Sequence, residues 1–371
     1  MNNNFQFYLP ARIIFGKSAV NSLPEAVYKE ENCVLLVTGS KSARNTGLAD
    51  KVKTILKDKK IILFDKVAPE PDTEIIDEGI KLAKQNNCKA VIGLGGGSAL
   101  DVAKAVAALV HEKSFISVAD FLEVDGTRKL LIPGVPFIAV PTTSGTGSEV
   151  TKNSVIINKK LANKRSLRSD LIFARCAIVD PELTLTLSAK MTAETGLDAL
   201  THTIEGYISK KSNKFTDAMA IKSIELVQES LITAVKYPDN YEAREKMSLA
   251  SLYGGILIAN SGVGLVHAIA PFLGSLYGTT HGLAVAVLLP YMMEYNMPST
   301  EGKIDDELIA AVKNISEEIG IPQALKELGI PEKDIPLIAE KSMTSVSIKI
   351  NPAPIDYNSM VKLLQKCWAG S

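Results

Sequence analysis

The sequence lacks the features that mark several classes of protein. Its 371 residues carry no net charge, because 41 Lys and Arg balance 41 Asp and Glu. Nucleic acids and anionic membrane surfaces favour basic partners, so we expect neither. No stretch approaches the roughly 20 apolar residues that a membrane-spanning helix needs. The start of the chain also lacks the basic segment and apolar core of a signal peptide, and we therefore expect a cytoplasmic protein.

Cysteine and histidine are scarce. The four cysteines lie far apart and include no Cys-x-x-Cys pair, which predicts buried thiols in a reducing compartment rather than disulfides or zinc ligands. There are also only four histidines, namely His111, His202, His267 and His281. With 46% hydrophobic and 22% charged residues, the composition otherwise allows a sizeable globular core.

The two halves of the chain differ in pattern. In the first half, short β-branched runs alternate with helical patterns, which predicts a parallel sheet covered on both faces. The predicted strands are 13–15, 33–37, 60–64, 90–93 and 137–140, and the predicted helices are 18–30, 48–57, 73–86 and 99–110. Later helices are predicted at 192–209, 213–235, 239–259 and 306–319. We therefore expect an α/β domain at residues 1–185 and an all-helical domain at 186–371.

A glycine-rich turn, residues 94–98, connects the predicted strand 90–93 to the following helix. Glycines let the backbone approach an anion closely, and a helix N-terminus offers unpaired N–H groups and a positive dipole. Pyrophosphate would suit this position, although the turn can also be no more than a tight turn. It does not match the GxGxxG fingerprint, so an ordinary Rossmann site is not indicated.

A second polar loop, residues 141–149, follows the predicted strand 137–140 and carries five hydroxyl side chains. Loops at the carboxyl ends of parallel strands form the usual ligand crevice of such folds. Its hydroxyl groups and glycines could hydrogen-bond phosphate and ribose. The alternative is a solvated surface loop.

The second half contains a candidate set of metal ligands. Asp198 and His202 are four residues apart in a predicted helix and so share one face, an arrangement that is more often a simple hydrogen bond. On one unbroken helix His267 and His281 would be about 21 Å apart, so the chain must turn between them if both bind one ion. Gly274, Gly278 and the pair Thr279-Thr280 could supply such a break. An Asp/His/His/His set would suit Fe(II), Zn(II) or a similar divalent ion.

Together these motifs resemble the iron-containing (group III) alcohol dehydrogenase family, and the similarity runs through almost the whole chain. Residues 95–104 match the family motif GGGSxxDxAK, residues 141–149 match its second cofactor loop, and residues 196–202, 264–268 and 281–282 match its metal motifs. The resemblance implies an α/β nucleotide-binding domain followed by a helical metal domain, as in dehydroquinate synthase-like folds. It also implies hydride transfer between NAD(P)(H) and a small primary alcohol or aldehyde, and a homodimer.

The resemblance further implies which residues form the site. One divalent metal, iron(II) with zinc(II) as the alternative, would be bound by Asp198, His202, His267 and His281. The cofactor would be held by Gly96, Gly97 and Ser98 at the pyrophosphate, and by Thr142, Thr143, Thr146 and Thr151 on the adenine and ribose side. Asp101 is also assigned to cofactor binding. Lys164 would meet the nicotinamide ribose. Asn153 lies where some diol-acting relatives have an asparagine that contacts substrate.

Two departures from the family pattern bear on specificity. NAD-preferring relatives often carry an aspartate where this chain has Gly39, and the carboxylate repels the 2′-phosphate of NADP. Gly39 removes that repulsion, while Ser40 and Lys41 can attract the phosphate, which predicts NADP(H) over NAD(H). Pro271 replaces a second histidine of the first metal segment, so a titrating imidazole is lost, and a proline is expected to bend or end the helix there.

Two other functions remain as alternatives. A dehydroquinate-synthase-like lyase would need basic residues around its phosphorylated substrate, but residues 265–270 and 278–284 contain no Lys or Arg. A non-catalytic nucleotide-binding protein would not need an intact set of metal ligands. Both observations favour the dehydrogenase.

Overall fold

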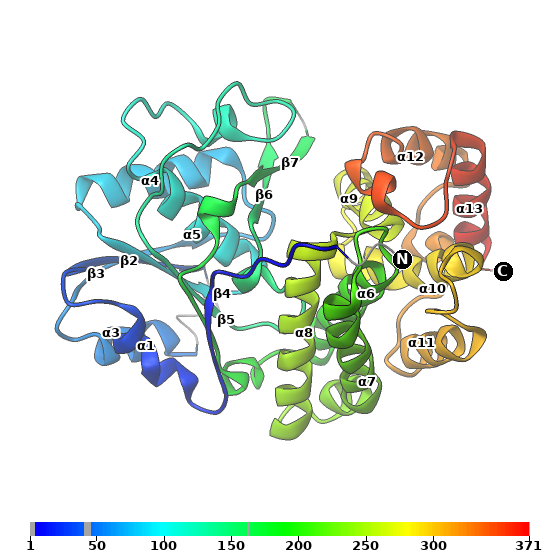
Figure 1. The fold of residues 1–371 in the computed structure, drawn as a ribbon, viewed down its shortest axis with the longest axis horizontal. Coiled ribbons are helices and arrows are strands. Elements are labelled where there is room, and N and C mark those ends of the chain that lie inside the picture. Colours follow the sequence, from blue (N-terminus) through cyan, green and yellow to red (C-terminus); the bar gives the residue numbers. More distant parts are fainter. Residues whose placement is uncertain (1–3, 41–45, 162, 371) are drawn as a thin grey trace. The chain divides into compact units, whose positions relative to one another are not determined.

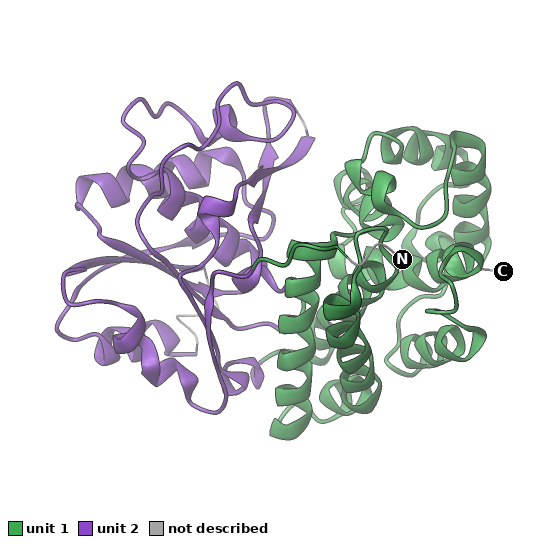
Figure 2. Ribbon diagram, in the orientation of Figure 1, with its two compact units in different colours: residues 1–8, 144–146, 187–371 green, residues 9–143, 147–186 purple. Residues whose placement is uncertain are grey.

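The computed structural model describes residues 4–40, 46–161 and 163–370 (Figure 1). The chain divides into two compact units (Figure 2). The α/β unit contains Leu9–Thr143 and Gly147–Thr186. The helical unit contains the residues up to Tyr8, the short segment Ser144–Thr146 and the residues from Leu187 onward.

The α/β unit is built on a six-stranded sheet in which every pairing is parallel. The strand order is β1-β8-β5-β4-β2-β3. The strands are β1 (Arg12–Phe15), β2 (Cys33–Gly39), β3 (Lys60–Val67), β4 (Ala90–Gly95), β5 (Phe137–Pro141) and β8 (Cys176–Val179). The predicted parallel sheet is confirmed, and β8 is a sixth strand that the sequence pattern did not reveal.

Helices cover both faces of this sheet. Leu35 and Val37 of β2 pack into one apolar cluster together with residues of α4 (Thr73–Gln85) and α5 (Gly97–Leu109). Val34 and Leu36, which point to the opposite face, pack into a second cluster with residues of α1 (Leu23–Ala26) and α3 (Leu48–Ile55). Burial on both faces explains why these strands are continuous apolar runs.

The helix predicted at 18–30 is much shorter in the structure, where a 3-10 turn (Ala19–Ser22) leads into the single helical turn α1. Side-chain carboxylates accept hydrogen bonds from backbone N–H groups near both ends of the predicted helix. Asp180 accepts from Ser18 and Val20, and Glu31 accepts from Tyr28. Such side-chain acceptors compete with helix formation.

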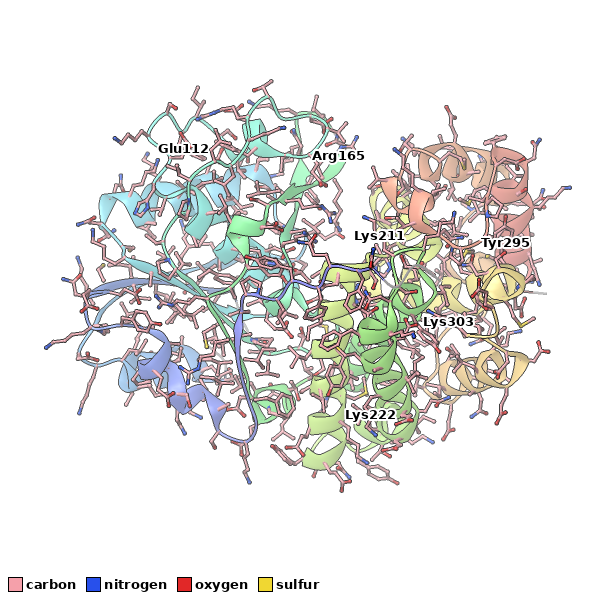
Figure 3. The ribbon with its side chains drawn as sticks, in the orientation of Figure 1. Glu112, Arg165, Lys211, Lys222, Tyr295 and Lys303 are labelled. Carbon is pink, nitrogen blue, oxygen red and sulfur yellow. The ribbon has the colours of Figure 1, made fainter. Side chains whose placement is uncertain are left out.

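A two-stranded antiparallel hairpin, β6 (Asn153–Asn158) and β7 (Asn163–Arg168), was not predicted. β7 is polar and lacks the β-branched residues typical of strands. Contacts outside the hairpin stabilise it instead, because Ile156 of β6 and Leu167 of β7 are buried in the same apolar cluster as α4 and α5. Two ion pairs add to this: Arg165, labelled in Figure 3, pairs with Asp125 at 3.0 Å, and Arg168 pairs with Glu123 at 2.6 Å.

The helical unit contains α6 (Ala189–Ile208), α7 (Lys214–Lys236), α8 (Tyr241–Ser261), α9 (Leu265–Tyr277), α10 (His281–Asn296), α11 (Asp306–Glu318), α12 (Ile335–Ser342) and α13 (Tyr357–Ala369). The central helix α6 is buried along most of its length. Gly196 and Gly206 of α6 allow close packing, because a Cβ at these positions would lie 2.3 Å from Leu231 Cδ1 and 2.8 Å from Leu257 Cβ, respectively. The predicted all-helical character of this half is confirmed.

The chain turns between α9 and α10, as the sequence argument requires, but Gly274 does not contribute to the turn because it lies inside α9. Gly278 adopts a left-handed conformation with φ of 70° and ends α9, and Thr280 precedes α10. However, α9 does not end at Pro271 but continues to Tyr277. Proline removes one N–H from the helix ladder, while Ile269 and Leu273 on either side of it are fully buried, and their packing stabilises the helix through this position.

Within the described ranges, a single helix with the length and apolar character to span a membrane is not found; only α8 and α9 taken together, which meet at 105°, reach those criteria. All four cysteines are buried and form no disulfide.

Candidate metal centre and nucleotide loops

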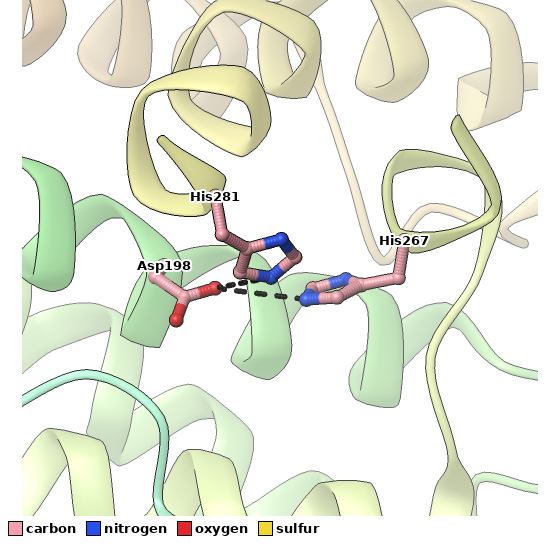
Figure 4. Close-up of side chains that lie close together, drawn as sticks. All are labelled: Asp198, His267 and His281. Atoms are coloured by element: carbon pink, nitrogen blue, oxygen red, sulfur yellow. Dashed lines mark ion pairs between the residues drawn. The ribbon is translucent and has the colours of Figure 1, made fainter. Parts of the chain in front are cut away.

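Four side chains from three helices of the helical unit converge on one point. Asp198 and His202 come from α6, His267 from the first turn of α9, and His281 from the start of α10. Asp198 Oδ1 lies 3.5 Å from Nε2 of His202 and 3.6 Å from Nε2 of His267. It lies 3.7 Å from Nε2 of His281, and Figure 4 shows how Asp198, His267 and His281 face one another.

This donor set fits a divalent metal. The ligand atoms of Asp198, His267 and His281 all lie within 4.8 Å of one another, and ligands around a tetrahedral ion with bonds of about 2.0–2.1 Å are roughly 3.3 Å apart. In the described part of the chain, Asp198 Oδ1 and His267 Nε2 are buried and have no hydrogen-bond partner. Buried polar atoms rarely lack one, so a bound cation would satisfy both atoms.

His202 completes the cluster on one side. Its ring stacks on that of His267, with ring centroids 4.5 Å apart and planes inclined by 22°. His202 is nearly fully buried. Of the four predicted ligands, the structure thus groups Asp198, His267 and His281, whose ligand atoms lie within 4.8 Å of one another. His202 lies beside this group, with Nε2 3.5 Å from Asp198 Oδ1, and its binding to the same ion stays a prediction. His111 is exposed and lies in the α/β unit.

Glu205 supports the cluster, although the sequence analysis did not identify it. Its Oε2 lies 2.6 Å from His267 Nδ1, and its Oε1 accepts the backbone N–H of Val266 at 2.6 Å. A proton on Nδ1 leaves the Nε2 lone pair of His267 directed at the metal position. A signal for Glu205 does exist, because residues 198, 202 and 205 follow the helical spacing of four and three on one face of α6.

Burial and charge act against each other in this cluster. Burial raises the pKa of Asp198, but the neighbouring imidazoles, His202 foremost, hold it well below its usual range. Burial lowers the pKa of His202 to about 4 against the opposing charge of Asp198. Burial also lowers the pKa of His267, but the charge of Glu205 outweighs it and raises that pKa to about 9. The ionised Asp198 and the neutral His202 are in the forms that bind metal, whereas His267 has to release its Nε2 proton when a metal ion binds.

The predicted glycine turn lies between β4 and α5. Gly95 has a φ of 153°, and a Cβ there would come within 2.8 Å of Ala99 Cβ, so this position requires glycine. Gly96 precedes α5 without a side-chain cap, and Gly97 and Ser98 form its first turn. The helix N-terminus is thus open to an anion. A Cβ at Gly96 would lie 3.2 Å from Thr143 Cγ2, which places the two predicted cofactor loops in contact.

Buried polar contacts attach the second loop and β6 to α5. The Asp101 carboxylate accepts from Ser148 Oγ at 2.7 Å and from the backbone N–H of Val155 at 2.9 Å. Lys104 Nζ is fully buried and donates to Ser148 O and Oγ, Thr151 Oγ1 and Asn153 O at 2.8–3.0 Å. Burial lowers the pKa of Lys104 to about 8 against the charges of Asp101 and Glu149. In this structure Asp101 and Thr151 position the loop, and direct contact with a cofactor stays a prediction.

We expect Lys104→Met to destabilise the α/β unit by about 3–5 kcal/mol, because the buried acceptors around Nζ and the Asp101 carboxylate lose their cation. The measurement is the free energy of unfolding from urea denaturation. Lys53→Met, which removes an exposed lysine from α3 of the same unit, is the control and should change it by less than about 0.5 kcal/mol. Equal stability of the two variants would contradict the role assigned to Lys104.

The other predicted residues lie on neighbouring elements. Lys164 Nζ on β7 pairs with Glu70 at 2.9 Å. Asn153 at the start of β6 has a buried Oδ1 that accepts no hydrogen bond from the described residues. Gly39 ends β2, and the N–H of the exposed Ser40 donates to Val67 O at 3.0 Å. Lys41 lies outside the described residues, and Thr142 N donates to Gly95 O at 3.0 Å.

A glycine turn at the carboxyl end of a parallel strand, combined with an Asp/His cluster on buried helices, defines an enzyme that uses a nucleotide and a metal. Comparison with known families agrees. Residues 10–181 match the iron-containing alcohol dehydrogenase family, and residues 192–368 match the C-terminal domain described as Fe-containing alcohol dehydrogenase family.

Individual relatives are similar over nearly their whole length. The chain is 36% identical to 1,3-propanediol dehydrogenase of Citrobacter freundii, covering 94% of this chain and 95% of the relative. It is 33% identical to NADPH-dependent butanol dehydrogenase of Clostridium saccharobutylicum (99% and 98% covered). It is 30% identical to NAD-dependent methanol dehydrogenase of Bacillus methanolicus (97% and 98% covered).

A solved structure of a 1,3-propanediol oxidoreductase superposes with a TM-score of 0.93 at 32% identity, covering 98% of this chain and 100% of that one. This chain belongs to the iron-containing alcohol dehydrogenase family. Its reaction class is the metal-dependent transfer of a hydride between a nicotinamide cofactor and an alcohol or aldehyde.

Proposed function

We propose that this protein interconverts small primary alcohols and aldehydes, with iron(II) bound by Asp198, His202, His267 and His281 and with NADP(H) preferred over NAD(H). The observation that carries the proposal is the approach of three imidazole Nε2 atoms to within 3.5–3.7 Å of one buried carboxylate oxygen. A mixed nitrogen and oxygen set of this kind suits Fe(II), with Zn(II) as the alternative.

When bound, the divalent ion polarises the substrate oxygen and stabilises negative charge on it, and the hydride chemistry itself belongs to the cofactor. The residues of this chain bind and orient the cofactor and the metal ion, and they exclude water from the site. The N-terminus of α5 would hold the pyrophosphate. Val266, Ala268 and Ile269 around His267 are buried, which keeps that side of the metal cluster dry.

Pro271 limits how protons move at this site. Its side chain can neither donate nor accept a proton, so α9 offers no second imidazole one turn beyond His267. General acid–base help is worth roughly 10²–10⁴ in rate, and proton exchange with solvent would instead use water or the ribose hydroxyls of the cofactor. Because the metal and the hydride geometry do not need the imidazole, we propose that the enzyme works without it and accepts less polar alcohols better than polyols.

The activity is tested with a panel of alcohols and aldehydes, assayed anaerobically with NAD(H) and NADP(H) and with added Fe(II) or Zn(II). We expect turnover of simple primary alcohols or their aldehydes, and higher activity with iron. A protein that retains its metal but turns over none of these substrates would contradict the proposal.

Gly39→Asp is expected to shift the cofactor preference towards NAD(H). A carboxylate at the end of β2 can accept hydrogen bonds from the ribose hydroxyls and repels the 2′-phosphate of NADP. The measurement is the ratio of kcat/KM for NADP(H) and NAD(H) in both proteins. The control is Asn32→Asp, which adds the same charge at an exposed position just before the other end of β2. A wild-type enzyme that strongly prefers NAD(H) would overturn the cofactor proposal. The relatives include both an NADPH-dependent and an NAD-dependent dehydrogenase.

We also propose that the protein acts in the cytoplasm as a homodimer. β1 lies at the end of the sheet and pairs, among the described strands, with β8 alone. Such an edge presents unpaired N–H and C=O groups to another chain. Sedimentation equilibrium should give twice the mass of the chain, and a purely monomeric protein at micromolar concentration would contradict the proposal.

A further inference from the structure

Three residues of the second loop pack with the helical unit rather than with the rest of the loop. Ser144–Thr146 belong to that unit by their contacts, whereas Thr142, Thr143 and Gly147 do not. Ser144 Oγ lies 3.0 Å from Ser248 Oγ on α8, and both residues are buried. The loop is therefore anchored to α8 by a pair of buried hydroxyl groups.

Gly145 lies directly against α6. A Cβ at this position would come within 2.7 Å of Thr195 Cβ and 2.8 Å of Thr195 O, so only glycine lets the loop backbone approach so closely. The Gly145 carbonyl oxygen lies 3.3 Å from His202 Nδ1. With Nδ1–H donating to this carbonyl, Nε2 keeps its lone pair for the cluster around Asp198.

Each of two metal-binding histidines thus has an oxygen partner for its second ring nitrogen. His267 uses the carboxylate of Glu205, and His202 uses a backbone carbonyl of the loop. A metal ion on Nε2 withdraws electron density from the imidazole and makes Nδ1–H a stronger donor, so metal and outer partner reinforce each other. For His202 that outer partner belongs to the loop whose threonines the family resemblance assigns to the cofactor.

We propose that metal binding and cofactor binding are cooperative in this protein, with Gly145 and Ser248 as the positioning residues that couple them. Metal at His202 strengthens the hydrogen bond to Gly145 and so orders the loop before the nucleotide arrives. Because linkage is reciprocal, the bound nucleotide strengthens metal binding by the same factor. The proposal rests on the metal site and cofactor loop of the proposed function and adds an energetic connection between them.

The test uses 2′-phospho-ADP-ribose and ADP-ribose, which contain the adenine, ribose and pyrophosphate but lack the nicotinamide. Their dissociation constants are measured by calorimetry with the full chain, depleted of metal by a chelator or reloaded with Zn(II). We expect the better ligand of the two to bind at least about fivefold more tightly to the metal-loaded protein, and Zn(II) affinity to rise by the same factor at saturating ligand. Equal affinities with and without metal would overturn the proposal.

Variants that still bind metal distinguish a loss of coupling between metal and nucleotide binding from a loss of the fold. Ser248→Ala removes the hydroxyl anchor and should lower the coupling factor, while Gly145→Ala displaces the carbonyl and should abolish it, with metal still bound in both. Ser230→Ala is the control, because this buried hydroxyl bonds only within α7, and it should keep the full factor. Full coupling in both loop variants would contradict the role of these residues. Metal content and alcohol turnover, measured separately, report on the proposed function itself.

Discussion

His267→Ala is expected to remove the metal and nearly all alcohol turnover. Asp198 and His202 both come from α6, and His267 comes from α9. The variant therefore removes the one proposed ligand that α9 contributes. Metal ions contribute several kcal/mol of transition-state stabilisation in such enzymes, which corresponds to a loss of roughly 10³-fold or more in kcat. Metal content by mass spectrometry and kcat under anaerobic conditions measure the two effects.

The control for this experiment is His111→Ala, which removes the exposed histidine of the α/β unit and should leave both quantities unchanged. His281→Ala should behave like His267→Ala, because its Nε2 approaches the same oxygen of Asp198. Full metal content and full activity in either ligand variant would show that these residues do not share a metal.

Glu205→Gln is expected to weaken metal binding about 10- to 100-fold while leaving the four ligands in place, an effect typical of partners that orient a ligating histidine. A glutamine keeps an acceptor oxygen at one of the two carboxylate oxygen positions, but at the other position it places an NH2 group, which donates. Either the Val266 N–H or His267 Nδ1 then loses its acceptor. A proton forced from Nδ1 to Nε2 of His267 would block the metal position.

The measurement is Zn(II) or Fe(II) affinity from competition with a chelator, together with kcat at saturating metal. Recovery of kcat at high metal concentration is expected, because Glu205 acts through His267 and does not touch the substrate. Glu229→Gln on the exposed side of α7 is the matched control. A Glu205→Gln protein with unchanged metal affinity would contradict this role.

The sequence was sufficient to predict the parallel sheet where burial on both faces dictates composition. Runs such as residues 33–37 and 90–93 are continuously apolar because helices cover both sides of the sheet. β8 is a four-residue apolar run that the sequence analysis did not assign to the sheet. β7 is polar except for Leu167, which is buried in the apolar cluster of the sheet and α5, and its other side chains pair with residues 123 and 125. One buried residue gives no periodic pattern, and local propensity does not report such contacts.

In the candidate site too, local sequence patterns were predictive, whereas contacts between distant residues could not be predicted. Asp198 and His202 could be paired from their spacing because one helix carries both. The convergence of α9 and α10 on α6 depends on packing, and spacing only showed that a turn had to intervene. Glu205 was missed because its role depends on a partner 62 residues away. That Ser144–Thr146 pack with the helical unit could not be read from a loop whose flanking residues belong to the α/β unit.

The buried ammonium group of Lys104 has a consequence for protein engineering. Four acceptors from the loop and β6 share this one cation, so substitutions at residues 101, 104, 148 and 151 are mutually dependent and single-site libraries there should yield mostly insoluble protein. Gly39 stands apart from this network at the end of β2, next to the exposed Ser40. If residues 39 and 40 set the cofactor preference as proposed, that preference can be redesigned independently of the contacts around Lys104.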